Sequence, residues 1–133
     1  MKYSIILFSL ITVLFSSCDP INFGTYHIEN TTLKNLEVRF YGVVQSEQDT
    51  LNLPPNEITE WRKISGRGDG ETRINMYKYY DSITLLLDDR VIKTYNSNSR
   101  GKSIYDYQFW DVKDKGNDHY EYTYSIEKSD IAE

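Results

Sequence analysis

The amino-acid sequence predicts an all-β protein, a single antiparallel β-sandwich of immunoglobulin-like or related topology with seven or eight strands. Three observations support this prediction. Alanine occurs once in 133 residues, at Ala132, while isoleucine, tyrosine, threonine and valine are plentiful, so strand formers replace helix formers. Most of the chain after residue 24 alternates apolar with polar residues. Turn-forming residues interrupt the alternation at short intervals, which is typical of sandwiches and barrels.

The alternation locates the expected strands. It is clearest over residues 36–41 and 120–127, where every second side chain is apolar. Asp88-Asp89 stands between two apolar segments and predicts a two-residue β-hairpin turn. Pro54-Pro55-Asn56 predicts another turn, and the glycine-rich residues 65–70 predict a loop. The other candidate segments are residues 26–29, 51–53, 58–64, 72–80, 82–87, 90–95 and 105–110, and seven or eight of all these segments are expected to form strands.

Residues 1–17 have the three-part layout of a secretory signal peptide. Lys2 supplies the positive start, residues 5–15 are largely apolar, and Ser16 and Ser17 are the small residues that precede a cleavage site. An eleven-residue helix rises only about 16 Å, whereas the hydrocarbon core of a bilayer is about 30 Å thick. We therefore expect a cleaved signal and not a membrane span.

The last residues of this segment indicate a particular type of cleavage site. Phe15-Ser16-Ser17-Cys18 resembles the relaxed lipoprotein box of Bacteroidetes-type lipoproteins, and Cys18 is the only cysteine of the chain. The resemblance implies cleavage before Cys18, a diacylglyceryl group on its sulfur and acylation of the new N-terminus. Two or three acyl chains hold a protein stably on a bilayer. The alternative is an ordinary secretory signal followed by an unmodified cysteine.

Cleavage before Cys18 would divide the chain into three parts: the signal peptide 1–17, a lipidated tether 18–24 and a β-sandwich domain 25–131. Because Lys2 is the only charged residue removed, the mature chain would have 116 residues and a net charge of −6 in place of −5. A domain of this length can bury a core without disulfides. Its acidic balance argues against nucleic acid as a partner, and we expect membrane contact from the anchor alone.

The C-terminal half carries a second, looser resemblance. Asp81-Ser82-Ile83-Thr84 leads to Asp88-Asp89, and Tyr122-Thr123-Tyr124-Ser125-Ile126 is followed by Ser129-Asp130. Residues 79–131 are thereby similar to the ending of many small Bacteroidetes-type lipoproteins of uncharacterised function. This resemblance implies an envelope location and a β fold, and it implies no biochemical activity.

Side chains for catalysis are sparse. His27 and His119 are the only histidines, and neither lies in the context of a nucleophile, so the sequence predicts no enzyme and no cofactor. Acidic residues gather around Gly116, but an EF-hand register there would place lysines at ligand positions. We expect a solvated hairpin turn without a metal; a looser calcium site is the alternative, on Asp111, Asp114, Asn117, Asp118 and Glu121.

Aromatic residues are the most suggestive feature of the mature chain, because they concentrate in three of the expected strands. Exposed tyrosine and tryptophan rings supply contact area to proteins and glycans at low entropy cost. Buried rings would instead fill the core and form cross-strand pairs. The sequence leaves both interpretations open, and the candidate binding surface consists of Tyr80, Tyr105, Tyr107 and Trp110.

Two tripeptides concern modification. Asp49-Thr50-Leu51 and Asp81-Ser82-Ile83 resemble the O-glycosylation motif of Bacteroidetes-type exported proteins, which implies sugars on Thr50 and Ser82. Arg67-Gly68-Asp69 is an integrin-type tripeptide that we interpret as a chance occurrence in a glycine-rich loop.

These observations favour a non-enzymatic lipoprotein of the outer membrane, on its periplasmic side, that binds or supports an envelope protein. Two alternatives remain at this stage. One is an immunity or inhibitor lipoprotein, since an acidic, tethered domain would attract a basic toxin or hydrolase. The other is a carbohydrate-binding module that uses the aromatic rings as platforms.

Overall fold

The computed structural model describes residues 20–45, 48–68 and 70–132, so the predicted signal peptide and Cys18 lie outside it. Eight strands make up most of the described chain. One short helix, α2 (Met76–Tyr79), precedes β5, and two 3₁₀ helices cover Tyr107–Phe109 and Lys128–Asp130. The strands are β1 Ile21–Asn30, β2 Leu36–Gly42, β3 Asp49–Leu53, β4 Glu57–Arg67, β5 Tyr80–Leu87, β6 Arg90–Asn96, β7 Trp110–Asp114 and β8 His119–Ile126.

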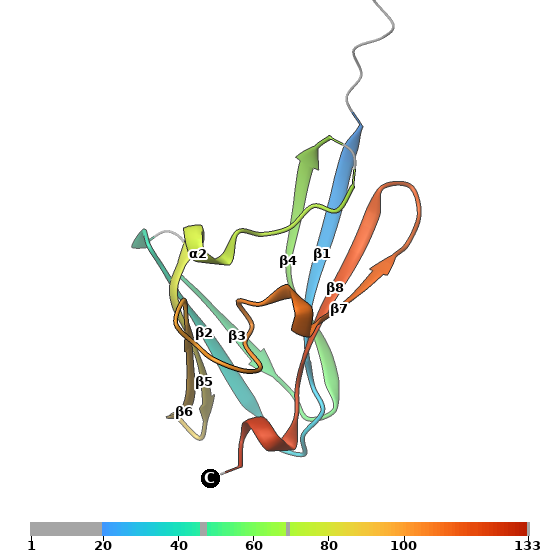
Figure 1. Cartoon of the computed structure of the whole chain (residues 1–133). Helices are drawn as coiled ribbons and strands as arrows, with labels where there is room; N and C mark the ends of the chain where they lie inside the picture. The colour runs from blue at the N-terminus through green and yellow to red at the C-terminus, as the bar shows by residue number, and fades with distance from the viewer. Residues whose placement is uncertain (1–19, 46–47, 69, 133) are drawn as a thin grey trace, which may run out of the picture.

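The strands form two four-stranded sheets that pack as a sandwich (Figure 1). Sheet A has the order β4-β1-β8-β7 and sheet B the order β3-β2-β5-β6. All neighbours are antiparallel except β1 and β8, which run parallel. The predicted all-β sandwich is confirmed. Its order is not that of immunoglobulin domains, whose first two strands share a sheet; here β1 and β2 lie in different sheets.

The core lies between the sheets and is rich in aromatic rings. Tyr26 of β1 stacks on Tyr122, its partner in the parallel register, with ring centroids 4.5 Å apart. Trp61 of sheet A stacks on Phe40 of sheet B at 4.2 Å. Period-two alternation on each strand turns these side chains inward. The other buried apolar side chains of the strands include Ile28, Leu36, Val38, Leu53, Ile83, Leu85, Tyr95, Trp110, Tyr124 and Ile126.

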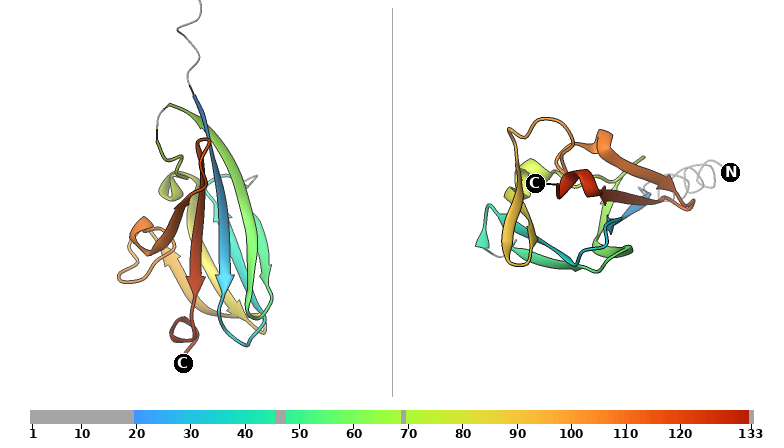
Figure 2. Two further views of the ribbon diagram at one scale, coloured as in Figure 1. Left: turned by 90° about the vertical axis from the view of Figure 1, so that its right-hand side faces the viewer. Right: turned by 90° about the horizontal axis from the view of Figure 1, so that it is seen from below.

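Two predicted strands are wrong, at residues 72–80 and 105–110. In the first, the Asn75 side chain accepts from the Lys78 N–H and begins helix α2. In the second, the Asp106 side chain accepts from the Gln108 N–H and begins a 3₁₀ turn, so the strand starts only at Trp110. Asn and Asp side chains compete with strand pairing through such local bonds. Figure 2 shows that the segment between β6 and β7 crosses from one sheet to the other.

The predicted hairpins are confirmed where turn residues specify them. Asp88 and Asp89 have φ values of 51° and 61°, as a two-residue turn of the I′ type requires, and they join β5 to β6. Asn117 and Asp118 have φ values of 53° and 57° in the turn between β7 and β8. The predicted tether is too long, because β1 already begins at Ile21.

The chain between β4 and α2 crosses the inner side of sheet A as an extended strap, which we define as residues 70–75. The Tyr26 hydroxyl donates to the Thr72 carbonyl (3.1 Å), and the Tyr107 hydroxyl donates to the Ile74 carbonyl (3.0 Å). The Ile74 N–H donates to both hydroxyls at 2.9 Å. Gly24 permits this close crossing, because a Cβ there would lie 3.0 Å from the Thr72 carbonyl oxygen.

Buried phenols make the fold sensitive to alkali. Burial raises the pKa of Tyr105 and of Tyr107 to about 12, against about 10 in an unfolded chain. A raised folded-state pKa gives stability that is complete below pH 10 and is lost as the pH rises towards 12. We therefore expect the free energy of unfolding to fall between pH 10 and 12, with phenolate absorbance and loss of the circular-dichroism signal changing together. Ionisation of every tyrosine with the fold intact would contradict this.

The described residues contain no helix that is both long and apolar enough to span a membrane.

Candidate functional site

The structure buries most of the candidate binding surface. Tyr80, Tyr105 and Trp110 are exposed by 2%, 3% and 5%, so their interpretation as an exposed strip is wrong and the core interpretation is confirmed for them. The Tyr105 hydroxyl donates to the Tyr80 carbonyl (2.9 Å), and the Trp110 indole donates to the Ile104 carbonyl (2.9 Å). Tyr107 is half-buried under the strap. These rings pack the domain and hold its loops.

A different group of apolar side chains is exposed beside them. We call it the α2 surface: Tyr41, Val43, Val44, Tyr77 and Tyr79, all among the exposed large hydrophobic residues. They come from the end of β2, the turn that follows it, and α2. The Val43 N–H donates to the Tyr79 carbonyl at 3.0 Å, which joins the two segments. Figure 1 shows α2 next to the end of β2.

A shallow hollow of about 300 Å³ adjoins the α2 surface. The rings of Tyr77 and Tyr105 lie 5.3 Å apart at its wall. The Arg73 guanidinium lies 5.0 Å from the centre of the Tyr107 ring and donates to the Glu71 carboxylate at 2.8 Å. This cation over an aromatic face fixes Arg73 beside the hollow. The site thus offers apolar rings and one paired cation, without a nucleophile next to a base.

The sequence does not locate the α2 surface, because alternation over residues 72–80 predicts a strand that includes Tyr77 and Tyr79. In the structure Met76 is buried, while Tyr77 and Tyr79 point outwards from a helical turn. The signal that could have located them is Asn75, a favoured N-cap residue directly before four residues without a turn former.

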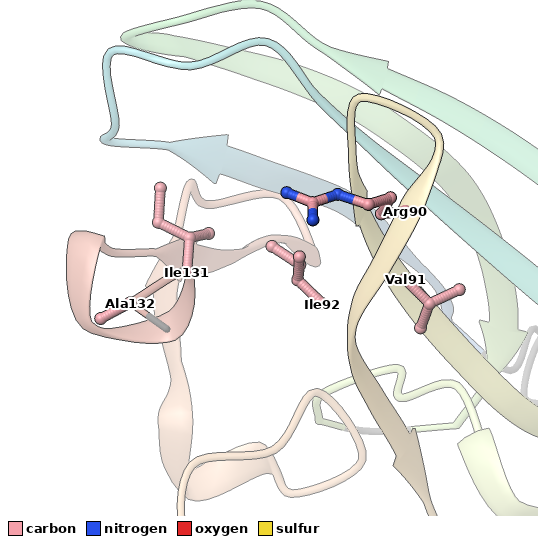
Figure 3. Close-up of a pocket in the computed structure, with 5 residues that line it drawn as sticks. All are labelled: Arg90, Val91, Ile92, Ile131 and Ala132. Atoms are coloured by element: carbon pink, nitrogen blue, oxygen red, sulfur yellow. The ribbon is translucent and has the colours of Figure 1, made fainter.

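A second hollow, of about 260 Å³, lies between the start of β6 and the C-terminal segment (Figure 3). Arg90 and Ile92 reach into it from β6, and Ile131 and Ala132 close it from the C-terminal segment. Its wall carries no aromatic ring and no acid, so it offers fewer kinds of contact than the α2 surface.

The acidic turn spreads its carboxylates apart. Asp111 pairs with Lys113 at 3.3 Å and Glu121 with Lys115 at 3.2 Å, while Asp114 accepts from the Gly116 N–H at 2.8 Å. Across residues 20–45, 48–68 and 70–132, no three His, Cys, Asp or Glu side chains converge in a way that would hold a metal.

The other sequence-predicted positions are dispersed. His119 contacts the Thr25 hydroxyl at 2.9 Å, and His27 is half-buried on β1. Thr50 is exposed on the edge strand β3, where a sugar would meet solvent, whereas Ser82 is half-buried on the inner strand β5. Glycosylation of either residue stays a prediction.

Comparisons of the chain with protein-family models, with curated proteins and with solved structures find no match.

Proposed function

We propose that the chain is a lipoprotein of the cell envelope, anchored through Cys18, that acts as a non-enzymatic binding or accessory protein. The observation that carries the binding role is the α2 surface. Tyrosine and valine side chains that lie exposed and adjacent are typical of protein interaction sites. Most of the other tyrosines are used inside the core, so an exposed pair on one helical turn is available for a partner.

The shape and charge of the α2 surface favour a protein partner. Tyr77, exposed by 58%, and Tyr79, exposed by 36%, contribute aromatic area, while Val43 and Val44 add aliphatic area without charge. Lys78 lies over the Tyr79 ring at 5.6 Å and supplies a cation at the rim. Apolar centres with polar rims are the usual anatomy of interfaces, and tyrosines are frequent among their hot spots.

The location is proposed on the Phe15–Cys18 resemblance. A diacylated cysteine with a third acyl chain would hold the domain on the outer membrane, and we favour its periplasmic side. The bilayer and an envelope protein are then the two partners of the chain, and no nucleic acid is expected, since the mature net charge is negative.

Crosslinking in native membranes followed by purification of the full chain tests the proposal. We expect a stoichiometric envelope protein that is recovered with the wild-type chain and lost with the double variant Tyr77→Ser, Tyr79→Ser. Loss of two aromatic hot spots costs about 2 kcal/mol or more, which weakens binding by more than about tenfold. Val91→Ser is the matched control, because Val91 is equally exposed but lies on β6.

Other results would redirect the proposal. A secreted toxin or hydrolase captured by both the lipidated chain and its soluble Cys18→Ala form would replace it with the immunity alternative. Binding to sugars on a glycan array, weakened by the same double variant, would replace it with the carbohydrate-binding alternative. An envelope protein that is recovered equally with the double variant would show that the α2 surface is not the binding site.

A further inference from the structure

The start of β1 exposes two apolar side chains on the outer face of sheet A. Ile21 is 53% exposed and Phe23 is 48% exposed, although both belong to a regular strand. Gly24, Tyr26 and Ile28 turn inward, so the odd-numbered residues of β1 face away from the core. On this face His119 of β8 lies beside Phe23 in the parallel register, and its ring contacts the Thr25 hydroxyl at 2.9 Å, so polar side chains border the apolar pair. The apolar pair is therefore confined to the tip of the sheet.

The tip lies immediately after the proposed anchor, and its backbone is fixed. The Gly68 N–H donates to the Pro20 carbonyl at 3.1 Å, and the Asn22 side-chain amide donates to the carbonyls of Gly68 and Gly70 at 2.5 Å. These bonds make residues 20 and 22 part of the domain, which the sequence predicts to begin at residue 25. One residue, Asp19, lies between Cys18 and Pro20, so the chain reach between them is about 7 Å at most.

This short reach brings the tip to the membrane surface. An acyl-bearing Cys18 lies at the level of the lipid headgroups, so Pro20 must lie within about 7 Å of that level. The headgroup region is several ångströms deep. Because β1 adds about 10 Å between Pro20 and Phe23, Ile21 and Phe23 lie within about 17 Å of the level of Cys18.

Charges of both signs lie beside the tip, cations on β4 and acids on the β7–β8 side. Arg67 pairs with Ile21 in the β1–β4 register, and Lys63 pairs with Thr25. Lys63 is neutralised by Glu60 at 3.0 Å. Arginine and lysine place their aliphatic stems along apolar surface while their charged ends reach headgroups. β1 has no acidic residue between Pro20 and Glu29, whereas the β7–β8 turn places Asp118 beside the tip, where its carbonyl accepts from the Phe23 N–H at 2.8 Å.

We infer that Ile21 and Phe23 enter the interfacial region of the bilayer that holds the Cys18 anchor. The domain then stands on the membrane with the outer tip of sheet A against the lipid, and the expectation of contact through the anchor alone is incomplete. The inference rests on the proposed lipidation of Cys18. The hollow at Ile131 would face away from the membrane, because it lies at the other end of the strands (Figure 1).

Spin labels can test this placement, because acylation removes Cys18 as a thiol and an introduced cysteine becomes the only one. The lipidated full chain with Phe23→Cys is labelled with a nitroxide and reconstituted in vesicles of phosphatidylethanolamine and phosphatidylglycerol. Ile58→Cys is the matched control. Ile58 is 59% exposed on the same outer face and pairs with Glu29, about 20 Å further along β1 from Phe23.

We expect the label at position 23 to collide more often with oxygen, which dissolves in lipid, than with a water-soluble nickel chelate. The label at position 58 should show the reverse. Ile21→Cys provides a second position with the same expectation as Phe23→Cys. Equal access of the chelate to positions 23 and 58 would overturn the inference, and so would dipolar broadening at position 23 that disappears on dilution with unlabelled chain, since a second copy would then cover the tip.

Mass spectrometry of the N-terminal peptide from the same sample separates the two proposals. Acylated Cys18 together with a water-exposed label at position 23 would overturn the membrane contact alone. An unmodified Cys18 would overturn the proposed anchor and, with it, the inference.

Discussion

Trp61→Ala is expected to cost about 3–5 kcal/mol of the free energy of unfolding, the largest effect of any single side chain discussed here. Trp61 lies on β4 of sheet A but packs on side chains of both sheets. It stacks on Phe40 of sheet B at 4.2 Å, meets Tyr26 edge-on at 6.0 Å and approaches Tyr80 at 5.8 Å. Its removal would leave a cavity between the sheets, lined by rings that cannot all move to fill it.

Chemical denaturation followed by near-ultraviolet circular dichroism measures this loss, and Trp61→Phe is the matched control. The buried Trp61 indole N–H has no hydrogen-bond partner among the residues that the structure describes, so phenylalanine removes ring area without breaking any of the described hydrogen bonds. We expect about 1 kcal/mol for Trp61→Phe. A loss below about 1 kcal/mol for Trp61→Ala would mean that Trp61 does not hold the two sheets together.

Asp130→Ala is expected to cost about 3 kcal/mol, because it breaks a buried ionic cluster at the C-terminus. The Asp130 side chain is 4% exposed and accepts from Lys93 (2.8 Å), Lys102 (2.9 Å) and the Glu127 N–H (2.9 Å). Lys93 comes from β6 of sheet B, and Asp130 follows β8 of sheet A, so the cluster joins the two sheets. Removing one member of a buried pair costs about 3–5 kcal/mol, and the partial exposure of both lysines places Asp130 at the lower end.

The same cluster makes the free energy of unfolding depend on pH in the acidic range. Burial opposes ionisation of Asp130, but hydrogen bonds from Lys102, Lys93 and the Glu127 N–H outweigh it, and its pKa lies below the usual range. A carboxyl with a lowered folded-state pKa contributes fully above the unfolded value of about 3.9, and the contribution is lost as the pH falls below that value. The difference in stability between wild type and Asp130→Ala should therefore shrink below about pH 4.

Denaturation at several pH values tests both the cost of Asp130→Ala and its pH dependence, with Asp111→Ala as the control. Asp111 and Lys113 form an ion pair whose side chains are both mostly exposed, so its loss should cost less than about 1 kcal/mol. If Asp130→Ala costs no more than Asp111→Ala at pH 7, the C-terminal cluster does not stabilise the sandwich.

Local sequence signals predicted the strands and turns whose residues interact with near neighbours in the chain. Alternation over 36–41 and 120–127 agrees with β2 and β8, and Asp88-Asp89 forms the expected hairpin turn. Alternation failed over 72–80 and 105–110. A few alternating residues are also compatible with a single helical turn. One capping side chain, Asn75 or Asp106, then favours the turn over the strand.

The candidate functional residues also divide into those that local sequence predicts and those that only the tertiary structure places. The lipobox resemblance at Phe15–Cys18 is a property of consecutive residues, so the sequence alone predicts the anchor. The binding surface is not a property of consecutive residues. An aromatic residue on a strand can face the core or the solvent, and the segments that pack on the strand decide which. Tyr80, Tyr105 and Trp110 are covered by segments distant in the sequence, and Tyr77 and Tyr79 are left outside.

By itself the sequence determined the all-β class, most of the turns and the expectation of a lipid anchor, because each depends on residue types and local spacing. Only the tertiary structure decided the strand order, the parallel pairing of β1 with β8, the rigid start of the domain at residue 20 and the exposure of the α2 surface. These depend on contacts between distant segments, whose free energy is set by the complete packing and not by any one stretch of chain.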